Sequence, residues 1–242
     1  MATISIAPSE QTLVPPLERG DSLGAIEFLR RYEAMPDVKK AELIEGIVYM
    51  PSPVSRAHAA PNTLIQTWLG LYSIRTPSTE ANGDATVRLG PKNVPQPDAL
   101  LWILPECGGR ARLDPKGYFL GPPELIVEVA ASSAAVDLHC KLRAYRRAGV
   151  REYLVWRPRE RQFDWFVLHQ NEYRLNAPSN PGVLRSPHFP GLDLSVEALL
   201  DHDWGQVLDV LQTGLQTRAH AAFVALLAAR KDTASKKGIL PP

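Results

Sequence analysis

The feature that most constrains the fold is the apolar run Leu125–Ala130, which carries an acid, Glu128, within it. Turn-forming segments, Gly121–Pro123 and Ser132–Ser133, bound this run, so it predicts a fully buried strand. Burying a carboxylate costs several kcal/mol unless a cation or hydrogen bonds compensate for the lost water. Glu128 is therefore either part of a functional site or one partner of a buried salt bridge.

A second acid, Asp98, stands thirty residues earlier and directly follows Pro97 at the start of the predicted strand Ala99–Leu104. Proline is tolerated at the first position of a strand and fixes the local backbone. Asp98 is either a turn residue without a further role or a ligand held at the end of a sheet. Two acids on neighbouring strands favour Mg²⁺ or Mn²⁺, which prefer oxygen ligands, and the sequence has no His/Cys cluster with zinc spacing.

The order of elements after Glu128 predicts an α/β fold. A helix over about Ala134–Ala148, with Gly149 suited to its left-handed cap, leads to the strand Glu152–Trp156. A strand–helix–strand unit of this kind implies a right-handed parallel crossover. A hairpin of Phe163–Leu168 and Tyr173–Leu175 adds antiparallel strands, so we expect a central mixed β-sheet flanked by helices.

Earlier segments predict further elements. Gly46 is a turn either between two short strands or between a helix end and a strand. The other predicted elements are a helix over Ser22–Tyr32 with Ser22 as N-cap, a helix over Ser55–Ile74, a strand over Thr86–Leu89 and a long loop over 105–123.

Length and composition predict one domain with appendages, because 242 residues that are 45% hydrophobic can bury a large core. We divide the chain into a flexible N-terminal arm (1–20), a main domain (21–200), a C-terminal helical extension (201–230) with an apolar stripe, and a frayed tail (231–242).

Composition also limits the class of protein. No stretch approaches the roughly 20 apolar residues of a membrane helix. The N-terminus lacks the basic start and apolar centre of a secretion signal, so we expect a cytoplasmic location. Cys107 and Cys140 form no CxxC pair and are expected to be free thiols. A net charge of +1 gives no global signature of nucleic-acid binding.

Lys141 lies on the helix that follows the Glu128 strand. Its ammonium either pairs with Asp137, one helical turn away, or points at the acids, where it would stabilise charge on a phosphate. Tyr145, one turn further along, is expected in the core.

Several of these residues occur in an order that resembles the Uma-type putative restriction endonucleases, a former domain of unknown function within the PD-(D/E)xK nuclease superfamily. The resemblance spans roughly Gly24 to Leu199, and the ordered set of motifs is more specific than any one of them. These motifs are Glu42–Gly46, Pro97-Asp98, Ile126–Val129, the spaced residues Asp137, Lys141 and Tyr145, and Ala148–Tyr153.

The resemblance implies a restriction-endonuclease-like core in which Asp98 and Glu128 bind Mg²⁺ or Mn²⁺. It implies that Glu42 is an additional acidic ligand. The superfamily usually has a lysine two residues after the second acid, where this chain has Ala130; the family often supplies the lysine from the next helix, which here indicates Lys141. His58 falls near a position where relatives often have histidine and is a further candidate.

Three functions follow as hypotheses. The first is a metal-dependent endonuclease acting on phosphodiester bonds, with duplex DNA as the expected substrate. The second is a catalytically inactive nuclease-fold module that binds nucleic acid or a partner protein. The third is an assembly protein that acts through its C-terminal helix.

Two further expectations concern binding. Cleavage of two strands favours a two-fold arrangement, so we predict a homodimer with the C-terminal helix near or in its interface. Basic residues between 141 and 161 are either a phosphate-binding stripe or a solvated helix face; they are Lys141, Arg143, Arg146, Arg147, Arg151, Arg157, Arg159 and Arg161.

Overall fold

The centre of the fold is a six-stranded mixed sheet, as seen in a computed structural model that describes residues 14–50, 54–131, 133–178 and 182–236. The strand order is β11-β10-β9-β8-β5-β3. Strands β8 and β9 pair in parallel, and the other neighbours pair antiparallel. The strands are β3 (Thr79–Asn82), β5 (Ala99–Ile103), β8 (Leu125–Val129), β9 (Glu152–Arg157), β10 (Gln162–His169) and β11 (Glu172–Leu175).

The predicted parallel crossover is confirmed. Between β8 and β9 the chain forms a π-helical turn, η2 (Val136–Lys141), which continues directly into α3 (Leu142–Ala148). Gly149 ends α3 with φ 82°, in the left-handed region that glycine adopts without steric cost. The mixed α/β sheet expected from the order of elements is therefore present.

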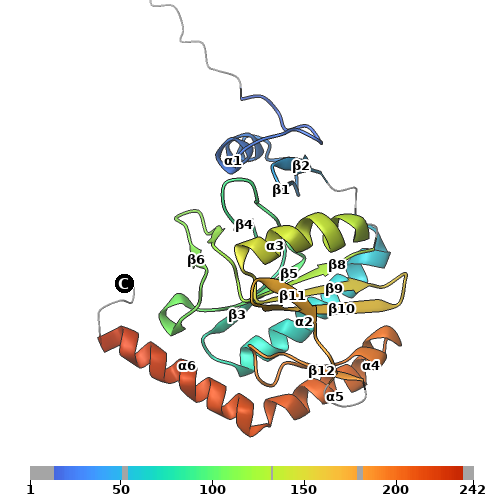
Figure 1. The fold of residues 1–242 in the computed structure, drawn as a ribbon, viewed down its shortest axis with the longest axis vertical. Coiled ribbons are helices and arrows are strands. Elements are labelled where there is room, and N and C mark those ends of the chain that lie inside the picture. Colours follow the sequence, from blue (N-terminus) through green and yellow to red (C-terminus); the bar gives the residue numbers. More distant parts are fainter. Residues whose placement is uncertain (1–13, 51–53, 132, 179–181, 237–242) are drawn as a thin grey trace, which may run out of the picture.

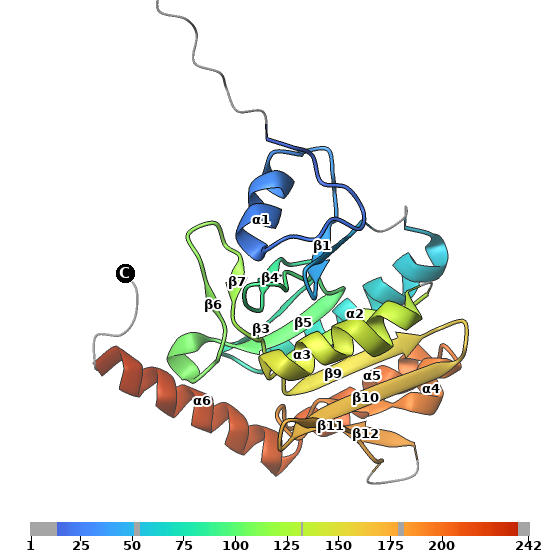
Figure 2. The same cartoon turned by 45° about the horizontal axis from the view of Figure 1, so that its top comes forward.

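Helices cover both faces of the sheet (Figure 2). On one face α2 (Arg56–Arg75) contributes Trp68 to a core cluster that includes Val127 and Leu154. On the other face α3 contributes Tyr145 to a second core cluster that includes Ile126. Because side chains alternate along a strand, Glu128 falls on the Ile126 face, beneath α3.

The N-terminal part forms a small lobe above one end of the sheet (Figure 1). It contains α1 (Ala25–Glu33) and the hairpin of β1 (Glu42–Ile44) and β2 (Ile47–Tyr49), which joins the rest through a bridge between Leu43 and Val94. The alternative of a turn at Gly46 between two strands is thus the correct one. Ser22 is not the N-cap of α1, because Gly24 occupies that position and Ser22 bridges to Ile47.

Two segments differ from the sequence-based expectation. The predicted loop 105–123 contains short ordered elements: η1 (Pro105–Cys107), β6 (Arg112–Leu113) and β7 (Phe119–Leu120), which pairs with β4 (Val87–Arg88). Strand β3 was not predicted, since its sequence, Thr-Glu-Ala-Asn, has no apolar alternation. Pairing with β5 creates this strand.

The C-terminal part packs across the α2 face. It consists of β12 (Val183–Arg185), β13 (Asp193–Ser195), α4 (Val196–Leu200), α5 (Trp204–Leu215) and α6 (Arg218–Lys236). Part of the predicted apolar stripe of this segment is buried: Val207, Leu211 and Leu227 belong to the core that includes Trp68.

The predicted chain ends need adjustment. Helix α6 continues to Lys236, past Lys231 where we predicted the frayed tail to begin, and 237–242 lie outside the described residues. Of the predicted arm 1–20, residues 1–13 lie outside the described part, whereas Leu17 is buried against the N-terminal lobe. In the described residues, no helix combines the length and apolar character needed to cross a membrane.

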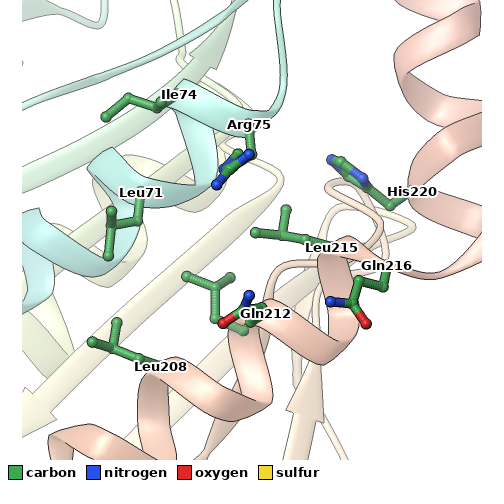
Figure 3. Close-up of a pocket in the computed structure, with 9 residues that line it drawn as sticks. Leu71, Ile74, Arg75, Leu208, Gln212, Leu215, Gln216 and His220 are labelled. Carbon is green, nitrogen blue, oxygen red and sulfur yellow. The ribbon is translucent and has the colours of Figure 1, made fainter.

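A groove of about 480 Å³ lies between α2 and the two C-terminal helices (Figure 3). Leu71 and Ile74 from α2 line one side, and Leu208 and Leu215 from α5 line the other. Ile74 is 75% exposed, so part of this apolar surface remains in contact with solvent.

Candidate active site

A cleft of about 690 Å³ opens between the N-terminal lobe and the sheet, on the side of the sheet covered by α3. It contains all the candidate residues derived from the sequence. Its charged and polar lining consists of Lys39, Lys40, Glu42, Ser55, His58, Asp98, Glu128, Ser133, Lys141 and Arg159.

The strand register brings the two core acids together. Ala99 in β5 pairs with Val127 in β8, so one step further along the antiparallel ladder Asp98 lies beside Glu128. The backbone N–H of Val129 donates a 2.8 Å hydrogen bond to Asp98 Oδ2. Asp98 is 3% exposed and Glu128 2% exposed, so both carboxylates are buried at the cleft floor.

Glu128 is held by two donors from the helix above it. Lys141 Nζ donates to Glu128 Oε1 over 2.9 Å, and the Tyr145 hydroxyl donates to the same oxygen over 2.8 Å. Tyr145 is buried in the core, as expected, and is also a hydrogen-bond partner of the acid, which the sequence did not reveal.

Glu42 reaches the same cluster from the β1–β2 hairpin. Its Oε1 accepts a 2.8 Å hydrogen bond from the backbone N–H of Gln96 and lies 3.0 Å from Lys141 Nζ. The N-terminal lobe thereby contributes an acid to a site whose other members lie on the sheet.

Lys141 is surrounded by carboxylates. Besides Glu128 and Glu42, it lies 3.6 Å from Asp137 Oδ1, and its side chain is only 5% exposed. Asp137 Oδ2 accepts a 2.5 Å hydrogen bond from Ser133 Oγ. Both sequence-based alternatives for Lys141, the pair with Asp137 and the approach to the acid cluster, therefore hold at once. The π-helical turn places both residues there, and such turns are frequent at functional sites.

Burial and neighbouring charges set the protonation of this cluster. Burial raises the pKa of Glu128 well above its ordinary value, against the opposing charge of Lys141, and the nearby carboxylates raise it further. Burial lowers the pKa of Lys141, but the carboxylates, Glu128 first, outweigh it and raise this pKa well above its ordinary value. The lysine is therefore charged and is the internal cation of the acid cluster.

Asp98 has a different environment. Burial by itself raises the pKa of Asp98, but the hydrogen bond with His58 and the charge of Lys40 outweigh burial and hold this pKa well below its usual range. His58 Nε2 lies 3.2 Å from Asp98 Oδ2, and Lys40 Nζ lies 3.2 Å from Asp98 Oδ1. The hydrogen bond to Asp98 in turn raises the pKa of His58. Asp98 is thus an ionised carboxylate with three partners.

Lys40 is a charged cleft residue that was not predicted from the sequence. It lies two residues before Glu42, and in an extended chain residues i and i+2 point to the same side. The spacing was a usable signal once Glu42 was a candidate.

The donor set fits a divalent cation in chemical type. Asp98, Glu128 and Glu42 offer only carboxylate oxygens, which Mg²⁺ and Mn²⁺ prefer. With Asp137, four carboxyl groups lie around the ammonium groups of two lysines. Among the described residues, no three His, Cys, Asp or Glu side chains are arranged so that they could hold a metal ion. The ammonium groups of Lys40 and Lys141 lie against the acids instead.

The basic residues between 141 and 161 do not form a continuous stripe along the cleft. Arg143 and Arg147 pair with Glu45, and Arg157 pairs with Glu160 and Asp164. Ion pairs also engage Arg146 and Arg161. Of the arginines in this stretch, Arg159 lines the cleft. Most of these basic residues therefore belong to a solvated, ion-paired surface and not to a phosphate-binding stripe.

Comparisons with known proteins agree with this architecture. One solved structure, described as a putative nuclease belonging to DUF820 from Anabaena variabilis ATCC 29413, matches with a TM-score of 0.55 at 15% sequence identity. The match covers 73% of this chain and 97% of that one. At this identity the likeness establishes the fold, and it confirms the expected nuclease-like α/β core. Among curated proteins, none matches the chain.

The model of the Uma2 family, described as "Putative restriction endonuclease", matches residues 26–197. These residues include every candidate site residue and exclude α5 and α6. The resemblance seen in the ordered motifs is thereby confirmed, and the chain belongs to the Uma2 family of restriction-endonuclease-like proteins.

Proposed function

We propose that this protein is a metal-dependent endonuclease that hydrolyses phosphodiester bonds in duplex DNA. The observation that carries the proposal is the convergence of Asp98, Glu128 and Glu42, from three separate elements, on one cleft in a nuclease-like fold. Membership of the Uma2 family supports nuclease chemistry. The carboxyl groups at the cleft floor support a requirement for a divalent cation.

Each residue has a distinct proposed role. Asp98 and Glu128 would hold Mg²⁺ or Mn²⁺, and Glu42 would complete or extend the set of ligands. When bound, the ion would lower the pKa of a water and offset phosphate charge. The backbone N–H of Val129 fixes the orientation of Asp98, and Tyr145 fixes that of Glu128.

The role proposed for Lys141 changes with the structure. The sequence suggested an ammonium acting on a phosphate, yet its side chain is 5% exposed and contacts three carboxylates. We assign it a positioning role: it holds Glu128 and Glu42 together and offsets their repulsion. Loss of Lys141 therefore acts on the substrate only through the acids.

The test is nicking of supercoiled plasmid DNA by the full chain with Mg²⁺, with Mn²⁺ and with EDTA. We expect nicked and linear products with either metal and none with EDTA. Parallel reactions with single-stranded DNA and with RNA define the substrate, and we expect duplex DNA to be cleaved fastest. Absence of cleavage with every metal and every nucleic acid contradicts the proposal.

A second candidate is the inactive module that binds nucleic acid or a partner protein. The observation that favours it is the pairing of the acids with lysines, which balances much of the cleft charge without a metal. Retained DNA binding without nicking in any metal would establish this function instead.

We also propose that the chain forms a homodimer, with the groove between α2 and α5 at its interface. Leu71, Ile74 and Leu208 leave apolar surface exposed there, and burial of such surface stabilises association. Light scattering of the unmodified protein should give twice the chain mass of 26.7 kDa. The Ile74→Asp variant should give the mass of a single chain. The exposed control Ile26→Asp, on α1, should remain dimeric. A single-chain mass for the unmodified protein contradicts the dimer.

A further inference from the structure

The two lysines of the cleft differ in how freely they can move. Lys141 has a side chain that is 5% exposed and three carboxylate partners. Lys40 is 23% exposed, lines the cleft and precedes β1 in the N-terminal lobe. Lys141 is thus a buried cation inside the acid cluster, whereas Lys40 is a cation at the cleft surface.

The partners of Lys40 allow it to leave. Its ammonium lies 3.2 Å from Asp98 Oδ1 and 3.2 Å from Asp84 Oδ1. The Asp84 side chain is 56% exposed, so water can replace the lysine there. Asp98 keeps two other partners, His58 and the N–H of Val129. If Lys40 moves away, no buried carboxylate is therefore left without a partner. If Lys141 moved away, several buried carboxylates would lose their cation.

A cation at the cleft surface would also favour the binding of nucleic acid. A phosphodiester carries a negative charge, and the cleft floor carries the carboxylates of Glu42, Asp98 and Glu128. Repulsion between these groups opposes binding of nucleic acid unless a cation meets the phosphate. A lysine ammonium on a flexible four-carbon stem can turn from a carboxylate to a nearby phosphate oxygen.

We infer that Lys40 is a substrate-binding residue, whose ammonium exchanges its contact with Asp98 for a phosphate oxygen of the bound nucleic acid. This inference rests on the proposed nuclease function and adds a residue to it. It gives the two lysines separate tasks, with Lys141 positioning the acids and Lys40 contacting the phosphate.

The experiment measures the salt dependence of DNA binding, a readout that does not require turnover. A fluorescein-labelled duplex is titrated with the full chain at several NaCl concentrations in Ca²⁺, a hard cation accepted by carboxylate sites. A gel confirms that the duplex stays intact. The variants are Lys40→Met and Lys40→Gln, which remove the charge, and Lys40→Arg, which keeps it. The control is Lys92→Met, at an exposed lysine that does not line the cleft.

Loss of one phosphate contact should reduce the slope of log K against log[salt] by about 0.9 and weaken binding roughly tenfold near 0.1 M salt. We expect this result for Lys40→Met and Lys40→Gln, with a slope close to that of the unmodified protein for Lys40→Arg and Lys92→Met. Circular dichroism should show that the variants are folded, because Asp98 keeps its other partners, His58 and the N–H of Val129.

Two results overturn the inference, and they can be told apart. If the unmodified protein binds duplex and the charge-removing variants keep its slope, Lys40 does not contact phosphate while the proposed function stands. If the unmodified protein binds no nucleic acid at all, the proposed function fails and the role of Lys40 fails with it.

Discussion

Replacement of Lys141 by methionine is expected to lower the free energy of unfolding by about 3–5 kcal/mol, because it leaves buried carboxylates without their cation. Glu128, Glu42 and Asp137 all lie within 3.6 Å of the Lys141 ammonium. Methionine matches the length of the lysine stem, so the loss reports on charge more than on packing.

Urea unfolding followed by circular dichroism measures this effect as a shift of the midpoint. The control Lys39→Met changes an exposed lysine and should stay within about 0.5 kcal/mol of the unmodified protein. Adding Glu128→Gln to Lys141→Met removes one of the stranded charges and should recover at least about 1 kcal/mol. A loss below about 1 kcal/mol for Lys141→Met alone would show that the acids do not depend on this lysine.

Replacement of Asp98 by asparagine is expected to reduce cleavage of plasmid DNA by at least about 10²–10³-fold, because it removes the charge of a proposed metal ligand. Asparagine keeps the size of the side chain and can still accept the hydrogen bond from Val129. The variant should remain folded, although it loses charge-assisted bonds with Lys40 and His58 worth about 1.5–3 kcal/mol each.

Single-turnover nicking in Mn²⁺ measures the effect on cleavage. Asp209→Asn is the matched control, since Asp209 is exposed on α5 and far along the chain from the cleft residues. It should cleave at the unmodified rate. Cleavage by Asp98→Asn within threefold of that rate would remove Asp98 from the site.

Much of the candidate site could be located from the sequence because its acids interrupt strong local patterns. Glu128 stands out in an apolar strand, and Asp98 stands out where Pro97 opens another. Strand pairing alone then places the two side by side. Local sequence was sufficient there because a buried strand tolerates few residues other than apolar ones.

Other features depend on contacts between distant segments. Strand β3 has a polar sequence and exists through its ladder with β5. Lys40 pairs with Asp98, which is 58 residues away in the chain. Local pattern carries no information about such pairs, since the N-terminal lobe must first dock before Lys40 and Asp98 can meet.

The surroundings of Lys141 could not be predicted from the sequence for a different reason. Its spacing from Asp137 is that of an ordinary surface ion pair, and the sequence indicated no π-helical turn. The turn and the closure of the β1–β2 hairpin together bury the pair among Glu42 and Glu128. Because of this burial, we propose that the lysine positions the acids and does not act on the phosphate directly.

Calorimetric titration of the metal-free protein with Mn²⁺ tests most directly whether these acids form a metal site. We predict saturable binding by the unmodified protein, and loss of that heat in both Asp98→Asn and Glu128→Gln, with Asp209→Asn unchanged. Equal Mn²⁺ affinity in all four proteins, or no binding by any of them, would contradict a metal-dependent active site at Asp98 and Glu128.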